Sequence, residues 1–233
     1  MGSTRLPGKI LLPIVGMTLL ERVIDRARRA STIDEVVVAT THQPADDEIV
    51  ELGARAGFAV ERGNEDDLLD RYVGAARAHR ADVVVRVTSD CPLLDPGVMD
   101  RIVNEGRALE ADYASNVIEP RTWPRGLDAE AVTMDALERA WREDARPDWR
   151  EHVTPYFYRN PERFRLHAVY ADEDYSGHRW CVDTPEDLDL ITRIYGELGR
   201  DAFDWRDVLA IVDSHPGWAD LNREVVQKPV LPR

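Results

Sequence analysis

The chain has 233 residues, a mass of 26.5 kDa and a formal net charge of −14 from 30 basic and 44 acidic residues. This length suits one α/β domain with a well-buried core, so we expect a single domain over residues 1–233. The acidic balance argues against a nucleic-acid or anionic-membrane surface, which would need clustered basic residues. A small anionic substrate fits only where the site is locally positive or holds a metal ion.

The apolar stretches and the cysteines predict a cytoplasmic protein with no membrane contact. The longest apolar stretch, residues 10–20, contains Pro13 and Gly16 and is too short to span a bilayer. No positively charged segment with an apolar core opens the chain. Cys91 and Cys181 have neither metal-binding spacing nor the pattern of a disulfide framework, which fits a reducing compartment.

The first nine residues, Met-Gly-Ser-Thr-Arg-Leu-Pro-Gly-Lys, are typical of a cradle for a polyphosphate. Gly2 lets backbone N–H groups approach an anion, and Ser3 and Thr4 can donate further hydrogen bonds. Arg5 and Lys9 can balance the phosphate charge. The pattern is neither the Walker motif nor the dinucleotide fingerprint, and a disordered basic tail is the alternative interpretation.

This turn lacks the strand that usually precedes a phosphate-binding turn. Such turns leave the carboxyl end of a buried parallel strand, and only Met1 stands before this one. We therefore expect the cellular protein to carry about five to ten further apolar residues before Met1, enough for one strand. That strand would fill a central position of the sheet and raise the thermal stability.

Strands and helices alternate through the first half of the chain, which implies a parallel sheet. Thr18 and Glu21 form a capping box, and apolar residues at helical spacing then predict a helix over about 19–30. Runs rich in β-branched residues predict the strands. We expect strands at 35–40, 58–61 and 82–88, and helices at about 45–55, 68–76 and 96–109.

Polar residues follow the strands at the sheet edge where open α/β folds bind ligands. Thr41 or His42 could contact a ligand there, although most such loop residues only cap helices. Asp90 follows the strongest strand, and a carboxylate in that position suits a hard divalent cation that also holds phosphates. Asp90 could instead cap the next helix, but Asp95, directly before Pro96, is the better cap.

The second half departs from simple alternation. In residues 127–132 polar and apolar side chains alternate, so we expect a strand with one polar face. That face could line a pocket, but water is the simpler environment for Asp128 or Glu130. Glu151 and His152 lie among aromatics, as in sugar recognition, an ordinary packed segment or a subunit contact. Further strands are expected at 164–170 and 180–182, and further helices at about 134–144, 185–195 and 205–212.

Asp183 is the expected partner of Asp90. Thr184, with Pro185 at the first helical position and Asp187 three residues after Thr184, forms a helix start. Asp183 is therefore left over at the end of the expected strand. Two carboxylates on neighbouring strand ends can share one divalent ion.

Several motifs together resemble the cytidylyltransferase superfamily that makes CMP-activated acidic sugars, and in particular its spore coat polysaccharide biosynthesis protein F branch. They are Gly-Ser-Thr-Arg-Leu-Pro-Gly-Lys at 2–9, Ser-Asp-Cys-Pro-Leu at 89–93 and Val-Asp-Thr-Pro-Glu-Asp at 182–187, with further similarity at 64–72, 126–130 and 151–154. The resemblance covers nearly the whole chain. It implies a Rossmann-like nucleotidyltransferase fold, a GT-A-like three-layer α/β sandwich with a mostly parallel central sheet. It also implies CTP and Mg²⁺ as ligands and a homodimer.

The implied reaction is attack of a sugar hydroxyl on the α-phosphate of CTP with loss of pyrophosphate, in polysaccharide biosynthesis. Catalytic roles fall to Arg5, Lys9 and Asp90, and Mg²⁺ binding to Asp90 and Asp183. The nucleotide site would comprise Gly2, Ser3, Thr4, Arg5, Lys9, Thr41, Arg62 and Ser89, and the site for the acceptor sugar Arg121, Arg125, Asp128, Glu130, Glu151 and His152.

The chain differs from these relatives in two respects, and two other functions stay open. Relatives begin with a strand and an Ala-Arg pair before the position of Met1, and they often have Gly where this chain has Ser89. A GT-A-type glycosyltransferase with a nucleotide-sugar donor would use the acidic residues 172–174 as its metal motif. A catalytically silent nucleotide-sugar binding protein is the remaining alternative.

Overall fold

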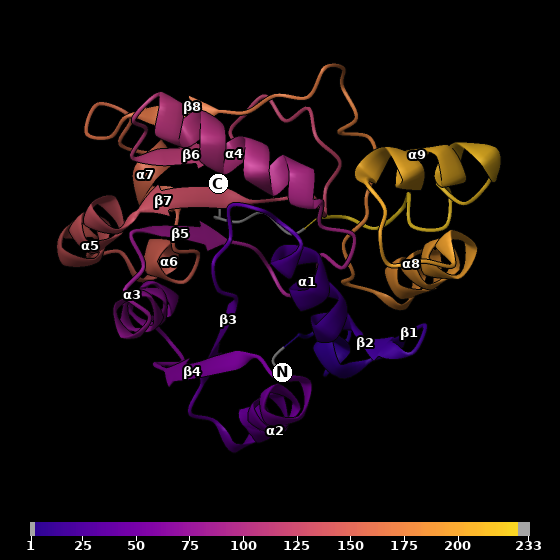
Figure 1. Cartoon of the computed structure of the whole chain (residues 1–233), viewed down its shortest axis with the longest axis horizontal. Helices are drawn as coiled ribbons and strands as arrows, with labels where there is room; N and C mark the ends of the chain where they lie inside the picture. Colours follow the sequence, from indigo (N-terminus) through magenta and orange to yellow (C-terminus); the bar gives the residue numbers. More distant parts are fainter. Residues whose placement is uncertain (1–2, 228–233) are drawn as a thin grey trace.

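A four-stranded sheet with the order β5-β7-β6-β8 forms the centre of the fold (Figure 1). The computed structural model of the chain describes residues 3–227, so Gly2 lies outside the described residues. β7 is antiparallel to β5 and β6, whereas β6 and β8 are parallel. Three strands of this sheet therefore run the same way. The strands are β5 (Val83–Arg86), β6 (Tyr113–Ser115), β7 (Glu130–Thr133) and β8 (Leu166–Ala168).

A separate parallel pair consists of β3 (Val37–Thr41) and β4 (Ala59–Gly63). A short antiparallel hairpin, β1 (Pro13–Ile14) and β2 (Met17–Thr18), precedes the first long helix. The predicted α/β fold with mostly parallel strands is confirmed. The observed sheet differs from the expected one because β7 is reversed and because β3 and β4 do not pair with β5.

Helices cover both faces of the central sheet and make the three layers. Buried residues of α4 pack with Ala129 and Ala131 on one face, and buried residues of α3 and α5 pack with Tyr113 and Val132 on the other. The helices are α1 (Leu19–Arg28), α2 (Asp47–Ala56), α3 (Leu68–Ala78), α4 (Pro96–Ala108), α5 (Met134–Glu143), α6 (Pro147–Arg150), α7 (Pro155–Tyr158), α8 (Pro185–Leu198) and α9 (Trp205–Ser214), with 3₁₀ turns η1 (Lys9–Leu11) and η2 (Pro44–Asp46). None of the helices formed by residues 3–227 has the length and apolar character needed to cross a membrane.

The helix starts agree with the capping residues in the sequence. Thr18 and Glu21 form the predicted capping box of α1. Asp95 caps α4 by accepting a hydrogen bond from the Val98 N–H at 2.9 Å. The capping box of Thr184 opens α8 in the same way. These caps satisfy N–H groups that a helix leaves without internal partners, so they fix where each helix begins.

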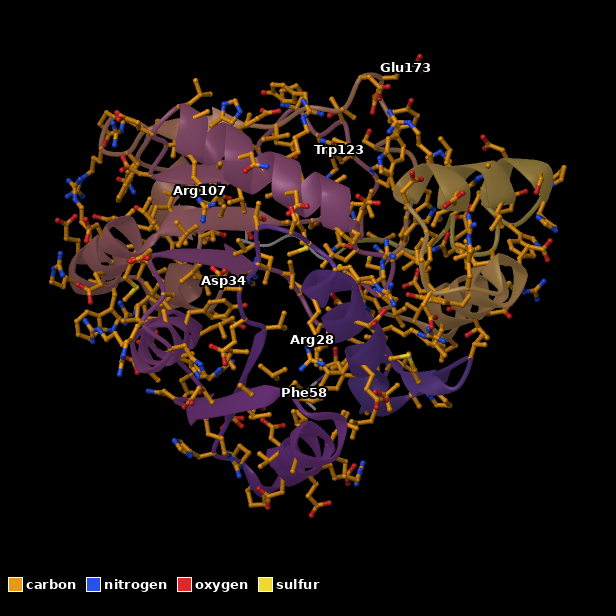
Figure 2. The ribbon with its side chains drawn as sticks, in the orientation of Figure 1. Arg28, Asp34, Phe58, Arg107, Trp123 and Glu173 are labelled. Atoms are coloured by element: carbon orange, nitrogen blue, oxygen red, sulfur yellow. The ribbon has the colours of Figure 1, made fainter. Side chains whose placement is uncertain are left out.

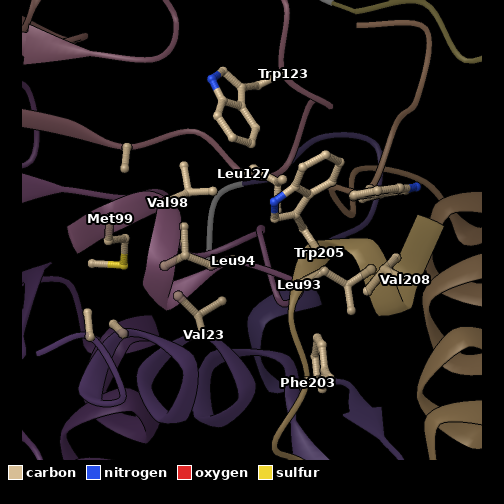
Figure 3. Close-up of a cluster of buried hydrophobic side chains, with 14 of the residues drawn as sticks. Val23, Leu93, Leu94, Val98, Met99, Trp123, Leu127, Phe203, Trp205 and Val208 are labelled. Carbon is tan, nitrogen blue, oxygen red and sulfur yellow. The ribbon is translucent and has the colours of Figure 1, made fainter. Parts of the chain in front are cut away.

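The main core joins α1, α4 and α9 beneath the loop that follows β5 (Figure 3). Leu93 and Leu94, which follow Asp90, are both fully buried in it. The guanidinium of Arg26, also buried, donates to the Leu94 carbonyl at 2.8 Å and to the Phe203 carbonyl at 2.9 Å. The loop that carries Asp90 is therefore anchored by packing and by buried hydrogen bonds.

Two sequence predictions are wrong in this part of the structure. Residues 180–182 form no strand, because their backbone groups bond to loops rather than to a strand ladder: the Trp180 N–H donates to Arg125 and the Val182 N–H to Asp90. Glu130 does not face water. It is 4% exposed, because β7 is a central strand whose second face is covered by α3 and α5.

Candidate active site

The structure brings Asp90 and Asp183 together at the carboxyl end of β5. Asp90 lies four residues after β5 ends, and Asp183 lies two residues before α8 begins. The Lys9 ammonium donates to Asp90 Oδ2 and to Asp183 Oδ1, each at 2.8 Å, and to the Val182 carbonyl at 2.7 Å. One cation therefore contacts both carboxylates, and in this structure that cation is the ammonium of Lys9.

Backbone contacts hold the two carboxylates close to each other. The Val182 N–H donates to the Asp90 carbonyl at 2.8 Å, which joins the two segments directly. Gly8, with a φ of +67° in the left-handed region, precedes η1 and turns the chain at the residue before Lys9. The position of Lys9 thus depends on a local turn, and the positions of the carboxylates depend on contacts between distant parts of the chain.

Two arginines surround Asp183 as well. Arg5 Nη2 and Arg179 Nη2 each lie 2.8 Å from Asp183 Oδ2. Arg179 also donates from Nε to Asp187 Oδ1 at 2.9 Å, and the Asp187 carboxylate is fully buried. Arg179 had no predicted role, although it lies four residues before Asp183 in the sequence.

The site is strongly charged. Burial acts to raise the pKa of Asp183, but the hydrogen bond and charge of Lys9, with Arg179 and Arg5, outweigh it and hold the pKa at about 2. Burial acts to lower the pKa of Lys9, but Asp90 and Asp183 outweigh it and raise the pKa above its usual value. Lys9 and Asp183 are therefore both charged at neutral pH.

The C-terminal segment contacts the same arginines. Arg5 Nη1 donates to the Val226 carbonyl at 3.0 Å, and Arg179 Nη1 donates to Gln227 Oε1 at 2.5 Å. Asn222, 4% exposed, donates to Asp187 Oδ1 at 2.8 Å. The first and last described segments of the chain thus meet at the carboxylates.

The other residues predicted for the nucleotide lie in separate surroundings. Thr41 donates through its hydroxyl to Asp46 at 2.5 Å, and Arg62 donates to the Thr41 carbonyl at 2.7 Å. These bonds form a group at the ends of β3 and β4 that none of the Lys9 hydrogen bonds reaches. Further out, Ser3 Oγ accepts from the Leu6 N–H at 3.3 Å, Thr4 is exposed, and both Ser89 and His42 are exposed.

Two ion pairs contain three of the six residues predicted for the acceptor sugar. Arg121 donates to both oxygens of Asp128, at 2.6 and 2.9 Å. Glu130 accepts from the guanidinium of Arg86 and from the Tyr113 hydroxyl. Because Asp128 and Glu130 alternate with alanines that are buried in the main core, both carboxylates turn toward the opposite face of the sheet.

Arg86 is a residue that sequence analysis missed. It is the single charged residue within the apolar run of residues 83–87, and that position could have marked it as a candidate. Its Nε is buried and has no hydrogen-bond partner, which leaves one donor free beside Glu130. Burial lowers the pKa of His152, and the charge of Arg86 lowers it further, against the opposing effect of Glu151. Glu151 itself is exposed.

Arg125 reaches the site through its backbone. The Trp180 N–H donates to the Arg125 carbonyl at 2.6 Å, and Arg125 forms an isolated parallel bridge with Arg179. The loop that carries Arg121 and Arg125 is therefore attached to the segment that leads to Asp183.

The acidic residues 172–174 do not gather around a common point. Asp172 pairs with Arg206 at 3.0 Å, and Asp174 accepts from the Ser176 N–H at 2.9 Å. Figure 2 shows Glu173 at the outer edge of the molecule. Within residues 3–227, no group of three or more His, Cys, Asp or Glu side chains could hold a metal ion. Cys91 and Cys181 are free, and burial raises the pKa of both thiols.

Gly126 offers a test of how the site is assembled. Its φ is +110°, and a Cβ there would lie 2.5 Å from the backbone carbon of Trp180. Gly126→Ala is therefore expected to push the 179–183 segment away and to lower the free energy of unfolding by about 2–3 kcal/mol. Gly196→Ala, in helix α8 with open space around it, should instead stabilise by about 0.5–1 kcal/mol. Urea unfolding of both variants measures this difference, and equal effects would contradict the close packing.

The chain is similar to known proteins over nearly its whole length. The cytidylyltransferase family matches residues 1–207. The protein MJ1063 of Methanocaldococcus jannaschii is 35% identical over 97% of this chain and 93% of its own length. The spore coat polysaccharide biosynthesis protein SpsF of Bacillus subtilis is 32% identical over 86% of this chain and 85% of its own length.

Solved structures share the fold. The structure of a cytidylyltransferase from Leptospira borgpetersenii aligns with a TM-score of 0.91 and 32% identity, over 97% of this chain and 95% of that chain. CMP:2-keto-3-deoxy-manno-octonic acid synthetase complexed with CTP aligns with a TM-score of 0.59 and 20% identity, over 84% of this chain and 95% of that chain. The predicted nucleotidyltransferase fold is therefore confirmed.

Proposed function

Because this chain belongs to the cytidylyltransferase family, we propose that it transfers CMP from CTP to a sugar hydroxyl, with release of pyrophosphate, in the synthesis of a glycan. The observation that carries the proposal is the contact of one cation, the Lys9 ammonium, with both Asp90 and Asp183. Phosphoryl transfer of this kind depends on charge neutralisation and alignment more than on covalent chemistry by the protein. The paired carboxylates, with Arg5 and Arg179 beside them, would supply both the charge neutralisation and the alignment.

The donor atoms around Lys9 fit Mg²⁺. Asp90, Asp183 and the Val182 carbonyl present three oxygens to one point, and Mg²⁺ prefers such hard ligands and usually keeps waters and phosphate oxygens as the rest of its shell. We assign the ion to the two carboxylates. When bound, Mg²⁺ would neutralise charge on the phosphates as pyrophosphate leaves.

Lys9 and Arg5 are the residues that we assign to the triphosphate. Lys9 contacts both carboxylates that would hold the ion, and with those carboxylates engaged its ammonium would be free to bind the phosphates. The guanidinium of Arg5 has one nitrogen on Asp183 and another on the Val226 carbonyl, and the second contact is a neutral one that a phosphate can replace. Arg179 stays on Asp187 and keeps Asp183 in place.

The acceptor sugar would bind at the Arg121–Asp128 ion pair, whose side chains are partly exposed, whereas Glu130 of the Arg86–Glu130 pair is buried. Arg121–Asp128 and Arg86–Glu130 hold their carboxylates in fixed directions, as recognition of sugar hydroxyls requires. We therefore propose Arg121 and Asp128 as acceptor contacts, with Arg125 as the cation for an acidic group of the sugar.

Replacing Arg121 tests the acceptor site. Arg121→Met releases Asp128 from its bidentate partner, so the KM for the sugar should rise about tenfold or more while the KM for CTP changes little. Arg193→Met, which removes an exposed pair on α8, is the matched control and should leave both constants unchanged. Steady-state kinetics with each substrate varied in turn decides it. An equal rise of both KM values would show that Arg121 acts on the fold rather than on the sugar.

A pyrophosphate assay tests the function itself. The protein is incubated with MgCl₂ and a panel of acidic and neutral sugars, with CTP, UTP, GTP or ATP in turn. We expect pyrophosphate with CTP and at least one sugar. Release of a nucleoside mono- or diphosphate from nucleotide-sugars would favour a glycosyltransferase, and tight CTP binding without pyrophosphate for any sugar would favour a binding protein.

The quaternary state and the compartment are further parts of the proposal. The resemblance supports a homodimer, and two cysteines without metal-binding or disulfide spacing fit the reducing environment of the cytoplasm. Light scattering of the purified protein should give twice 26.5 kDa, and a mass of 26.5 kDa would contradict the dimer.

A further inference from the structure

Residues 222–227 lie across the carboxylate site, and we call this segment the arginine strap. It lies outside residues 1–207, which the cytidylyltransferase family matches. Arg5 Nη1 donates to the Val226 carbonyl of the strap at 3.0 Å, and Arg179 Nη1 donates to Gln227 Oε1 at 2.5 Å. The other terminal nitrogen of each guanidinium, Nη2, lies 2.8 Å from Asp183 Oδ2. Each arginine therefore joins Asp183 to the strap.

The two ends of the arginine strap are held by contacts of different strength. Asn222 is 4% exposed and donates from Nδ2 to Asp187 Oδ1 at 2.8 Å and to the Arg179 carbonyl at 3.0 Å. Asp187 is itself fully buried, so this end is fixed to the protein interior. At the other end Val226 is 80% exposed, and Gln227 is exposed as well. A segment with so little buried apolar surface opens locally at a small cost in free energy, so the strap can move about Asn222.

The two acceptors on the strap are neutral oxygens. A guanidinium forms shorter and stronger hydrogen bonds with phosphate oxygens than with a carbonyl or an amide oxygen, because the phosphate acceptor carries charge. The Val226 carbonyl and the Gln227 side chain are consecutive in the chain, so they present two oxygens to two cations, as neighbouring phosphate groups would. A triphosphate at Arg5 therefore has to replace the strap there, and the same movement frees Arg179 Nη1.

We propose that the arginine strap competes with the triphosphate for Arg5 and Arg179, and that CTP binding moves the strap away about Asn222. Arg179 Nη1 then becomes a second cationic donor to the phosphates, while its Nε stays on Asp187 and its Nη2 stays on Asp183. The strap lowers the apparent affinity for CTP in proportion to the fraction of molecules in which it is closed. This proposal rests on the assignment of Arg5 to the triphosphate.

A spin label on the strap tests the movement. Val226→Cys offers an exposed thiol at a residue whose carbonyl, rather than its side chain, contacts Arg5, and both native cysteines are buried. With saturating CTP and MgCl₂, the mobile fraction of the nitroxide spectrum should rise at least about twofold over that without nucleotide. The same label on Asn104→Cys, an exposed position of α4, is the matched control and should not change. An unchanged or less mobile label at position 226, in protein shown by calorimetry to bind CTP, would overturn the proposal.

Two changes at Gln227 test the competition through the affinity for CTP. Gln227→Glu gives Arg179 an anionic acceptor of the same shape and strengthens the strap, so the Kd for CTP should rise at least about threefold. Gln227→Met removes the acceptor at similar side-chain length, so the Kd should fall at least about threefold. Asn104→Asp, which adds the same charge on the exposed side of α4, should leave the Kd unchanged.

The Gln227→Met variant decides the proposal. Repulsion between the carboxylate of Gln227→Glu and CTP would raise the Kd even without a strap, whereas only release of Arg179 lowers it. Calorimetry with CTP and MgCl₂ in which Gln227→Met does not lower the Kd, while the wild type binds CTP, would overturn the strap alone. A wild-type protein that does not bind CTP would contradict the proposed function and the strap with it.

Discussion

Asp90→Asn and Asp183→Asn are each expected to lower kcat at least about a hundredfold while the circular dichroism spectrum stays unchanged. Asn keeps the shape of the side chain but removes the negative charge that pairs with Lys9 in this structure and that we assign to Mg²⁺. The measurement is steady-state pyrophosphate release at saturating CTP and sugar. Asp183→Asn should also lower the Tm, because Arg5 and Arg179 lose their shared partner.

Asp174→Asn is the matched control for these two variants. Asp174 is exposed and accepts a hydrogen bond from the Ser176 N–H, so the same chemical change there should leave kcat within about twofold of the wild type. If Asp174→Asn were inactive and Asp90→Asn active, the metal would belong to residues 172–174, and the glycosyltransferase would be the better account.

Lys9→Met should have two measurable effects. The loss of a cation from the triphosphate site should lower kcat about 10²- to 10³-fold. The variant should also gain more thermal stability from added MgCl₂ than the wild type does, because no ammonium competes for the position between Asp90 and Asp183. The second effect does not require turnover and separates competition for that position from a general loss of folding.

Arg29→Met serves as the control for Lys9→Met. It removes a cation from an exposed ion pair with Asp25 on α1, so kcat and the response to MgCl₂ should both match the wild type. A Lys9→Met protein with wild-type kcat would contradict the role of Lys9. An unchanged response to MgCl₂ would contradict the shared position.

Local sequence signals predicted most of the elements. The starts of α1 and α4 were predicted correctly from the capping pair Thr18–Glu21 and from the N-cap Asp95. A cap depends only on residues three positions apart, so the sequence alone shows it. The prediction of a strand at 180–182 was wrong because a strand needs a backbone partner in another strand. The partners of this segment are loops more than 50 residues away in the sequence. Periodicity within one segment carries no information about such a partner.

Charged residues of the site were predicted unevenly for the same reason. Asp90 follows a strong strand and Asp183 precedes a complete cap, so both stood out as carboxylates without a structural role. Arg179 and Arg86 bind carboxylates through contacts set by the tertiary fold, and Glu130 is buried because two helices cover its face of the sheet.

The fate of the two ends of the triphosphate tests the proposed reaction most directly. CTP labelled at the α-phosphorus and CTP labelled at the γ-phosphorus are incubated in parallel with the protein, MgCl₂ and the acceptor sugar. Attack at the α-phosphorus breaks the bond to the β-phosphate, so we predict the α label in a sugar nucleotide and the γ label in pyrophosphate. Transfer of the γ label to the sugar, or recovery of the γ label as inorganic phosphate with the α label in CDP, would contradict the account.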